Sequence, residues 1–349
     1  MLAQELDYVI GVDTHRDAHA LSFHRSPSGA RLLEAEVAAD QAGYADALAL
    51  AEEHSPGPRA WALEGAGAYG KGLARHLQAR GERVFEVERP KRPGGPGGRG
   101  KSDALDARRA ARALLEGERL ASPRAGGARE ALRVLLSTRE SAIQARRCAL
   151  NQLRALIVTC PEPLREELRS LTRARLLVRC RRLRAGAAPD PELAGTLLAL
   201  KLLAARIGAL TTEERLLARE LGALLEREAP ALLRERGVGP ISAAQVLVSW
   251  SHRGRFPREA CFARLGGAAP IPASSGRTVR HRLDRGGDRR LNRALHQIIV
   301  SRRKCDPRTR AYIARRTHEG KSEREAIRCL KRYLARHLFR VLEGAPAPA

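Results

Sequence analysis

The sequence lacks the features that mark a secreted, a membrane-spanning or a zinc-binding protein. Its first residues, MLAQELDYVI, contain no basic region followed by an apolar segment, and no run of about 18 apolar residues occurs. No CxxC pair and no Cys/His cluster with zinc-ligand spacing is present. We therefore predict a cytoplasmic protein without a membrane contact, whose cysteines are reduced and mostly buried. These are Cys148, Cys160, Cys180, Cys261, Cys305 and Cys329.

Acidic residues are too few to balance the basic ones. The 349 residues include 64 Lys and Arg against 39 Asp and Glu, which gives a net charge of +25 and an isoelectric point near 11.1. Arginine forks match phosphate oxygens and release counterions on binding, so the excess indicates a polyanionic partner such as nucleic acid. A GC-rich genome would also enrich Arg and Ala. The length predicts two or three domains.

The charge is distributed unevenly, which codon bias does not explain. Residues 1–90 hold 9 Lys and Arg against 14 Asp and Glu, a net charge of −5. Residues 251–340 hold 25 against 7, a net charge of +18. A short basic run is usually a solvated face, but a segment this long and this basic is typical of a surface that contacts phosphates.

The first 90 residues predict three strands followed by alternating helices and strands. DYVIGV, ALSFHR and RLLEAEV are short apolar or alternating segments separated by turns, which indicates an antiparallel meander. Helical stretches at 40–53 and 69–80 alternate with strands at 59–64 and 83–88. This order of elements is that of the RNase H-like fold, so we predict an α/β domain of this kind.

The remainder of the chain predicts helices. The Pro- and Gly-rich segment 89–100 reads as a flexible basic loop before the helical stretch KSDALDARRAARALLEG. From about 127 to 228 the apolar residues have helical periodicity, which indicates a long helical arm or coiled coil, a spacer that also dimerises. Gly237, Gly239 and Pro240 then interrupt two helical runs, either as a helix-hairpin-helix that holds a DNA phosphate or as an ordinary turn.

Four acidic residues are candidates for a metal site. Asp13 and Glu64 stand where predicted strands end, and Asp103 and Asp106 share one face of a helical turn. Magnesium prefers oxygen ligands and is usually held by a few carboxylates together with substrate phosphate, and a pair of ions can stabilise the attacking and leaving oxygens of phosphoryl transfer. Taken singly, each has an alternative: a turn for Asp13, a solvated strand end for Glu64, and helix capping for the pair.

A serine loop is the second candidate. Ser274 and Ser275 precede Gly276 in a segment rich in Pro and Gly, and four arginines follow within ten residues. A serine hydroxyl attacks phosphorus only if its proton is removed and the developing charge is balanced, for which guanidinium groups or a metal are suited. The motif alone is weak, because most serines in such loops form turns.

These motifs resemble those of the DEDD transposases of the insertion-sequence one-ten family, relatives of Piv-type DNA invertases. The N-terminal resemblance comprises GVDTHRD, the strand and turn ALEGAGAYG, and KSDALDA. The C-terminal resemblance comprises RGVGPISAAQVL, LGGAAPIPASSGRTVRHRLDRGGDRRLNRALH and DPRTRAYIARR. The two blocks occur in the family's order and together span essentially the whole chain.

The resemblance implies a fold, a reaction and partners. It implies a RuvC-like Mg²⁺ site formed by Asp13, Glu64, Asp103 and Asp106, and a covalent serine nucleophile, Ser275 with Ser274 as the fallback, that acts as in a serine recombinase. Donor and target DNA, a structured guide RNA encoded by the element and a homo-oligomer, dimer or tetramer, are the implied partners. Nucleic-acid contacts are predicted for Lys101, Gly237, Gly239, Arg277, Arg280, Arg282, Arg285, Arg289 and Arg290.

The predicted domains follow from these motifs. They are a RuvC-like catalytic domain at 1–120, a helical coiled-coil arm at 121–228, a mainly helical C-terminal transposase domain at 229–343 and a disordered tail at 344–349. Two other functions remain open at this stage. One is a metal-dependent RuvC-like nuclease that uses water as the nucleophile, and the other is a non-catalytic, domesticated nucleic-acid-binding protein.

Overall fold

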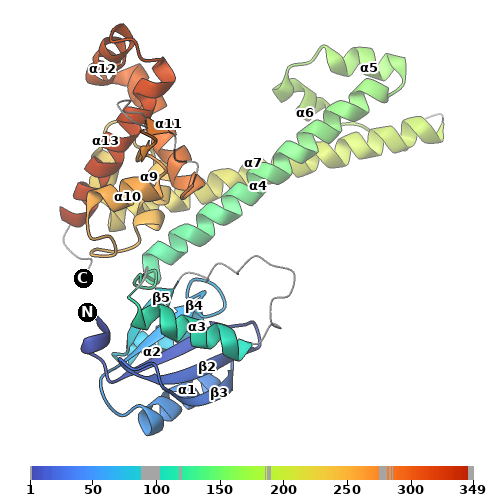
Figure 1. Ribbon diagram of the computed structural model, residues 1–349. Coiled ribbons are helices and arrows are strands. Elements are labelled where there is room, and N and C mark those ends of the chain that lie inside the picture. Colours follow the sequence, from blue (N-terminus) through green and yellow to red (C-terminus); the bar gives the residue numbers. More distant parts are fainter. Residues whose placement is uncertain are drawn as a thin grey trace. The chain divides into compact units, whose positions relative to one another are not determined.

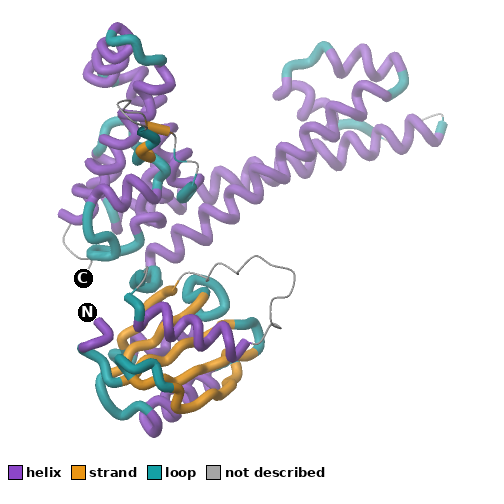
Figure 2. The backbone as a smooth tube through the Cα atoms, in the orientation of Figure 1, coloured by secondary structure: helices purple, strands orange, loops and turns teal. Residues whose placement is uncertain are grey.

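The chain forms two compact units, Met1–Gly126 and Gly127–Ala349. A computed structural model describes residues 2–87, 103–117, 120–184, 186, 190–274, 281–282, 284 and 286–344. Figure 2 shows a sheet with helices in the first unit and a predominance of helices in the second. The predicted mixed α/β N-terminal region and the mostly helical remainder are therefore confirmed.

A five-stranded mixed sheet forms the centre of the first unit, and its strand order is β3-β2-β1-β4-β5. β1 pairs antiparallel with β2 and parallel with β4, so the three-stranded meander and the two later strands share one sheet (Figure 1). The strands are β1 (Tyr8–Thr14), β2 (Ala18–Arg25), β3 (Arg31–Ala38), β4 (Arg59–Glu64) and β5 (Arg83–Val87). The helices are η1 (Leu2–Gln4), α1 (Gln41–His54), α2 (Lys71–Ala79) and α3 (Asp103–Leu115).

Both faces of the central strands are buried, which is why β1 and β4 are apolar at nearly every position. Successive side chains of a strand point to opposite faces. Even-numbered residues of β1 such as Ile10 and Val12 pack with Ala47 of α1 and Leu73 of α2. On the opposite face, the strand residues Val9, Ala60, Ala62 and Val87 pack against Ala110, Ala111 and Leu114 of α3.

One glycine allows α3 to lie directly on the sheet. Gly11 is in the middle of β1, and a Cβ atom at this position would lie 2.0 Å from the carbonyl oxygen of Ala107 and 2.6 Å from the amide nitrogen of Ala111. Backbone atoms cannot yield as a flexible side chain would, so only glycine permits this separation. The small residues Ala107 and Ala111 complete the close contact from the helix side.

A buried histidine lies beneath the opposite face. His19 of β2 is fully buried and stacks on Tyr44, with the ring centroids 5.8 Å apart. Within the described residues neither ring nitrogen of His19 has a hydrogen-bond partner. Burial accordingly lowers the pKa of His19 below its usual value, and burial also lowers the pKa of the neighbouring His76.

Two long helices, α4 (Gly127–Thr159) and α7 (Pro191–Glu228), run side by side in the second unit (Figure 1). The short helices α5 (Glu162–Arg169) and α6 (Arg173–Arg181) lie between them in sequence and share a core that includes Leu153, Leu200 and Ile207. Arg139 and Arg146 of α4 form ion pairs with Glu214 of α7. The predicted helices at 127–228 are thus present, whereas dimerisation through them stays a prediction.

By length and composition alone, one helix of the described residues, α7, could cross a membrane. Its most apolar window has a mean hydropathy of 1.7, with 22% of that window buried, and satisfies the length and composition of a span. Packed helices of soluble proteins meet the same criterion, so this single helix does not establish a membrane span.

The rest of the second unit is a helical bundle with a short hairpin. Its core includes Phe262, Leu295, Ile298, Leu338 and Phe339. The helices are α8 (Pro230–Arg234), α9 (Pro240–Trp250), α10 (Glu259–Leu265), α11 (Arg289–Cys305), α12 (Pro307–His318) and α13 (Glu323–Gly344). The hairpin strands β6 (Ile271–Pro272) and β7 (His281–Arg282) pair antiparallel.

We predict that Gly11→Ala destabilises the first unit by about 1–3 kcal/mol, because the added methyl group must push α3 away from β1. Urea unfolding would be followed by the fluorescence of the buried Trp61 in a Trp250→Phe background. Gly67→Ala is the matched control, since a Cβ atom there would meet its nearest neighbour at an ordinary 3.7 Å. Equal stability of the two variants would contradict the close-contact interpretation.

We also predict that His19 contributes to acid sensitivity. Burial lowers its folded-state pKa below the usual histidine value of 6.5, so the unfolded chain binds more protons in this range. Stability therefore falls as the pH falls from about 7.5 towards the folded-state pKa. His19→Phe keeps an aromatic ring against Tyr44 and removes this titration. The same fluorescence assay should show a smaller loss of stability at low pH for this variant, and an unchanged pH profile would refute the assignment.

Candidate metal centre and nucleic-acid interface

Asp13 and Glu64 are brought together by the pairing of β1 and β4. They are register partners on adjacent parallel strands, and both are almost fully buried, at 3% and 7% exposure. Neighbouring strands lie about 4.8 Å apart, and register partners project to the same face. Asp13 is two residues beyond Gly11, and Glu64 is two residues beyond Ala62, so both carboxylates are on the face that α3 covers.

The contact at Gly11 determines where α3 delivers its acids. Asp103 lies one helical turn before Ala107, the residue that touches Gly11, so it reaches the carboxyl end of β1. His15 confirms this proximity, because its Nε2 atom is 3.0 Å from Oδ2 of Asp13 and 3.3 Å from Oδ1 of Asp103. Buried Asp13 and half-exposed Asp103 therefore meet at one histidine.

The described residues contain one group whose ligand atoms all lie within 4.8 Å of one another: Asp13, His15 and Asp103. Glu64 and Asp106 do not belong to this group. Asp106 instead accepts a hydrogen bond from Nη1 of Arg109 at 2.6 Å, one turn along α3. The structure thus gathers two of the four predicted carboxylates directly, and it positions Glu64 beside Asp13 and Asp106 on the same helical turn as Asp103.

His15 is the residue that the sequence analysis missed. The available signal was the alternation along β1, since Gly11, Asp13 and His15 are each two residues apart and so lie on one side of the strand's path. Carboxylate oxygens suit Mg²⁺ and Mn²⁺, and imidazole suits several transition metals. The donors present therefore fit a divalent cation, which His15 could either bind or serve by orienting the two aspartates.

The serine motif lies in the connection of the β6–β7 hairpin. Ile271 pairs with Arg282, and Pro272 pairs with His281, so Ser274 lies in sequence between the two strands. Ser274 follows β6 by two residues and is exposed to solvent. The remaining site predictions of this loop, and the one before α3, lie outside the described residues, namely Ser275, Arg277, Arg280, Arg285 and Lys101.

The glycines predicted to hold a phosphate differ in their surroundings. Gly237 has a φ of +76° and packs against α11, where an added Cβ atom would lie 3.2 Å from the carbonyl oxygen of Ile298. Its conformation is thus explained by the packing of two helices, the alternative that the sequence left open. Gly239 is exposed at the N-cap of α9, with Pro240 as the first helical residue.

The predicted nucleic-acid arginines of α11 are not equivalent. Arg290 pairs with Glu140 of α4 at 3.1 Å, and Arg293 pairs with the same carboxylate at 2.7 Å. The hydrogen bond from Arg293, aided by both positive charges, lowers the pKa of Glu140. Arg290 is therefore partly used within the unit, whereas Arg289 is exposed at the first turn of α11.

Comparison with known sequences shows similarity to transposases in two stretches of the chain. A profile for the DEDD transposases of IS110, described as "Transposase", matches residues 10–161, which contain all four predicted carboxylates. A second profile, described as "Transposase IS116/IS110/IS902 family", matches residues 229–314, which include the serine hairpin. The α/β unit with its acidic strand ends is thus consistent with the catalytic domain of a DEDD transposase. These two stretches of the chain are similar to transposases of the IS116/IS110/IS902 family.

Two curated relatives also show similarity to part of this chain. The "Insertion element IS110 uncharacterized 43.6 kDa protein" of Streptomyces coelicolor is 34% identical over 152 residues, or 42% of this chain and 38% of that protein. The "Insertion element IS900 uncharacterized 42 kDa protein" of Mycobacterium paratuberculosis is 32% identical over 152 residues, or 41% of this chain and 37% of that protein. The match thus spans less than two-fifths of each relative.

We predict that Asp13→Asn, Asp103→Asn and His15→Gln each weaken the binding of a divalent cation by about tenfold or more, because each removes a ligand or a group that orients one. Mn²⁺ binding measured by electron paramagnetic resonance and by calorimetry is the readout. Asp17→Asn is the control, since Asp17 is an exposed acid of the same turn that pairs with Arg16. An equal effect of the three Asp→Asn substitutions would show a non-specific loss of negative charge and would contradict a specific site.

Proposed function

We propose that this protein is a divalent-metal-dependent DNA transposase that cuts and rejoins strands by means of a RuvC-like carboxylate site and a serine nucleophile. The proposal rests on the proximity of Asp13 and Asp103 at the carboxyl end of β1, where both lie close to His15. The similarity of two stretches of the chain to transposase profiles supports it, because a transposase acts on DNA. Mg²⁺ is the proposed ion, because carboxylates and substrate phosphate are its usual ligands.

Each acidic residue has a proposed task. Asp13 from the central strand, Glu64 from the adjacent strand, and Asp103 and Asp106 from α3 would hold the divalent metal. Bound metal neutralises charge on the phosphate and activates an attacking oxygen. Arg109 would orient the carboxylate of Asp106 on α3, since its guanidinium group donates a hydrogen bond to that carboxylate.

The serine step proposed here divides strand exchange into two transfers. The Oγ atom of Ser275, or of Ser274, would form a bond to phosphorus while the bond from phosphorus to a deoxyribose oxygen breaks. That oxygen takes up a proton as it leaves, and a base must accept the proton of the serine hydroxyl. Attack by another strand's hydroxyl group then restores a phosphodiester and releases the serine.

The second unit supplies the proposed nucleic-acid contacts. Residues 251–340 carry a net charge of +18, which suits donor and target DNA and the guide RNA that the family resemblance implies. Sequence would be read by base pairing, while the protein contacts the backbone. The long α4–α7 pair is the proposed element of oligomerisation, and a composite site from two subunits would follow from it.

We predict that Asp13→Asn lowers strand exchange by at least about a thousandfold while DNA binding is retained, since one central carboxylate is lost and the basic surface is intact. Mg²⁺-dependent cleavage and rejoining of labelled element ends is the assay, and Asp17→Asn is again the control. Retention of full activity would refute the metal site. Absence of metal-dependent cleavage in the unsubstituted protein on every substrate would favour the domesticated binding protein.

Serine chemistry is tested separately. Ser275→Ala should abolish both strand exchange and a covalent protein–DNA adduct detected after denaturation, whereas Ser274→Ala should leave them largely unchanged. The reverse result would assign the reaction to Ser274. Persistent metal-dependent cleavage by the double alanine variant, without any adduct, would establish the nuclease alternative in which water attacks.

A further inference from the structure

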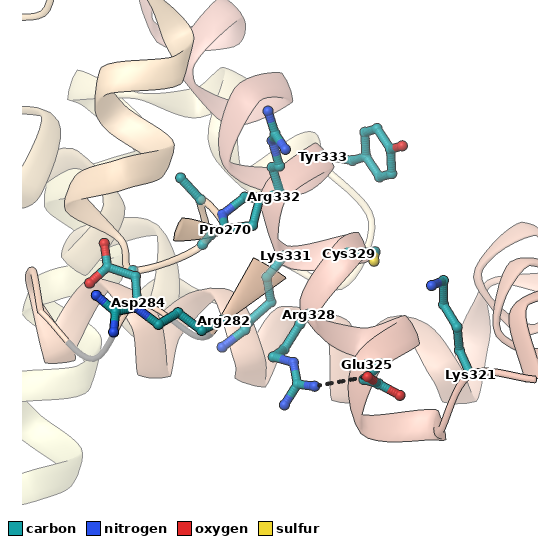
Figure 3. Close-up of a pocket in the computed structure, with 13 residues that line it drawn as sticks. Pro270, Arg282, Asp284, Lys321, Glu325, Arg328, Cys329, Lys331, Arg332 and Tyr333 are labelled. Atoms are coloured by element: carbon teal, nitrogen blue, oxygen red, sulfur yellow. Dashed lines mark ion pairs between the residues drawn. The ribbon is translucent and has the colours of Figure 1, made fainter. Parts of the chain in front are cut away.

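A cavity of about 420 Å³ lies beside the β6–β7 hairpin, within the second unit. Its walls are the segment Gly267–Pro270, the hairpin residue Arg282 and one face of α13 (Figure 3). A cavity of this size falls in the range of about 300–1,000 Å³ that encloses a small ligand. Its volume is therefore large enough for a single nucleotide.

Positive charge dominates the lining of this cavity. Arg328, Lys331 and Arg332 come from neighbouring turns of α13, and Lys321 and Arg282 complete the set (Figure 3). Two acids, Asp284 and Glu325, also line it. Among the described residues, Arg282 and Arg332 take part in no ion pair. The cavity thus presents more cationic groups than its own acids can balance.

Glu325 is occupied by local contacts. Its Oε2 atom accepts hydrogen bonds from the backbone nitrogen and the hydroxyl of Ser322, as a cap at the start of α13. These bonds, led by the hydroxyl, lower the pKa of Glu325, so it is ionised. Arg328 lies 3.6 Å from Oε1 of Glu325. Among the described residues, Glu325 forms no ion pair with the other cations of the cavity.

Lys331 is the strongest indication of an anionic ligand. Only 8% of this residue is exposed, and its Nζ atom donates to Oδ1 of Asn292 at 2.8 Å. No carboxylate of the described residues lies within ion-pair distance of it. An ammonium group has three donors and is costly to bury without an opposite charge. Burial, followed by the charge of Arg328, lowers the pKa of Lys331.

The same contacts attach Lys331 to the base of the serine hairpin. Asn292 of α11 donates from its Nδ2 atom to the carbonyl oxygen of Gly266 at 2.6 Å. The chain continues from there through the cavity wall into β6 and then to Ser274. Arg282 of β7, which follows the serine motif in sequence, lines the cavity as well. The β6–β7 hairpin therefore contributes to the cavity wall on both sides of the serine motif.

We propose that this cavity binds one unpaired nucleotide of the DNA strand that the nucleophilic serine attacks, with Lys331 and Arg332 holding the phosphate of that nucleotide. Tyr333, which is 57% exposed and lines the cavity, stacks on the base. The ring of Tyr333 is held edge-on by Tyr312 at a centroid distance of 6.2 Å, which keeps it oriented. The proposal rests on the serine-dependent function proposed above and names the form of DNA that it acts on.

Binding of a single-stranded DNA of about 12 nucleotides to the full-length protein tests the proposal, by fluorescence anisotropy in the presence of EDTA. Lys331→Met and Arg332→Gln should each weaken binding about tenfold, and each should reduce the slope of log K against log salt by about 0.7, the value for one lost phosphate contact on a single strand. Tyr333→Leu should weaken binding at least about fivefold without changing the slope.

Arg324→Gln is the matched control, because Arg324 is an exposed arginine of α13 outside the cavity. Its affinity should change by no more than about twofold. If Arg332→Gln and Tyr333→Leu, both of exposed residues whose loss spares the core, match this control, the proposal is overturned even if Lys331→Met fails to fold. The three cavity substitutions should weaken single-stranded DNA more than duplex of the same sequence, and an equal effect on both would also overturn it.

An RNA of the same sequence decides between two nucleic acids. Weaker RNA binding with unchanged DNA binding in the cavity variants would assign the cavity to RNA and overturn the DNA proposal. Because these measurements contain no divalent cation, their outcome does not depend on catalysis. Ser275→Ala should bind as the unsubstituted protein does, so a failure of the serine mechanism and a failure of the cavity assignment are distinguishable.

Discussion

The contact of helix α3 with the backbone of β1 at Gly11 is the constraint on which the candidate metal centre depends. A side chain at this position would overlap the carbonyl oxygen of Ala107, so the helix lies against the strand only because none is present. Helical rise then places Asp103 one turn before the contact, at the height of Asp13 two residues further along the strand. The carboxylates of Asp13 and Asp103 come close together because the backbones of β1 and α3 are in contact. Nε2 of His15 lies near both carboxylates.

Each unit buries an ionisable side chain at a proposed site, an acidic one in the first unit and a basic one in the second. In the first, Asp13 is buried and has the imidazole of His15, in the same turn, within hydrogen-bond distance. In the second, Lys331 is buried and donates to the amide oxygen of Asn292. Burial of a charge is unfavourable without compensation, so the first arrangement suits an added cation and the second an added anion. A phosphoryl-transfer protein needs both, a metal at the reacting group and a counter-charge for the strand.

The arginine content overstates the surface that is open to nucleic acid. Glu140, Glu214 and Glu259 each engage two arginines, and these clusters connect helices that are distant in sequence. Such half-exposed ion pairs contribute little stability individually, but they direct guanidinium groups into the fold. Charge counted along the chain therefore locates the basic region correctly, yet it does not distinguish Arg290, which binds Glu140, from Arg332, which is outside the ion pairs of the described residues.

The sequence by itself determined the elements of the first unit, since the alternation of DYVIGV and RAWALEG and the turns between segments are local signals that match β1 and β4. It also determined the four acidic positions and the helical character of the second unit. Only the tertiary structure decided which acids meet, because the contact between Gly11 and Ala107 joins residues nearly a hundred positions apart. The sequence did not predict the roles of His15 and Lys331 for the same reason. A single histidine or lysine in a sequence does not indicate its spatial neighbours. Its role follows from its burial and from the groups within hydrogen-bond distance.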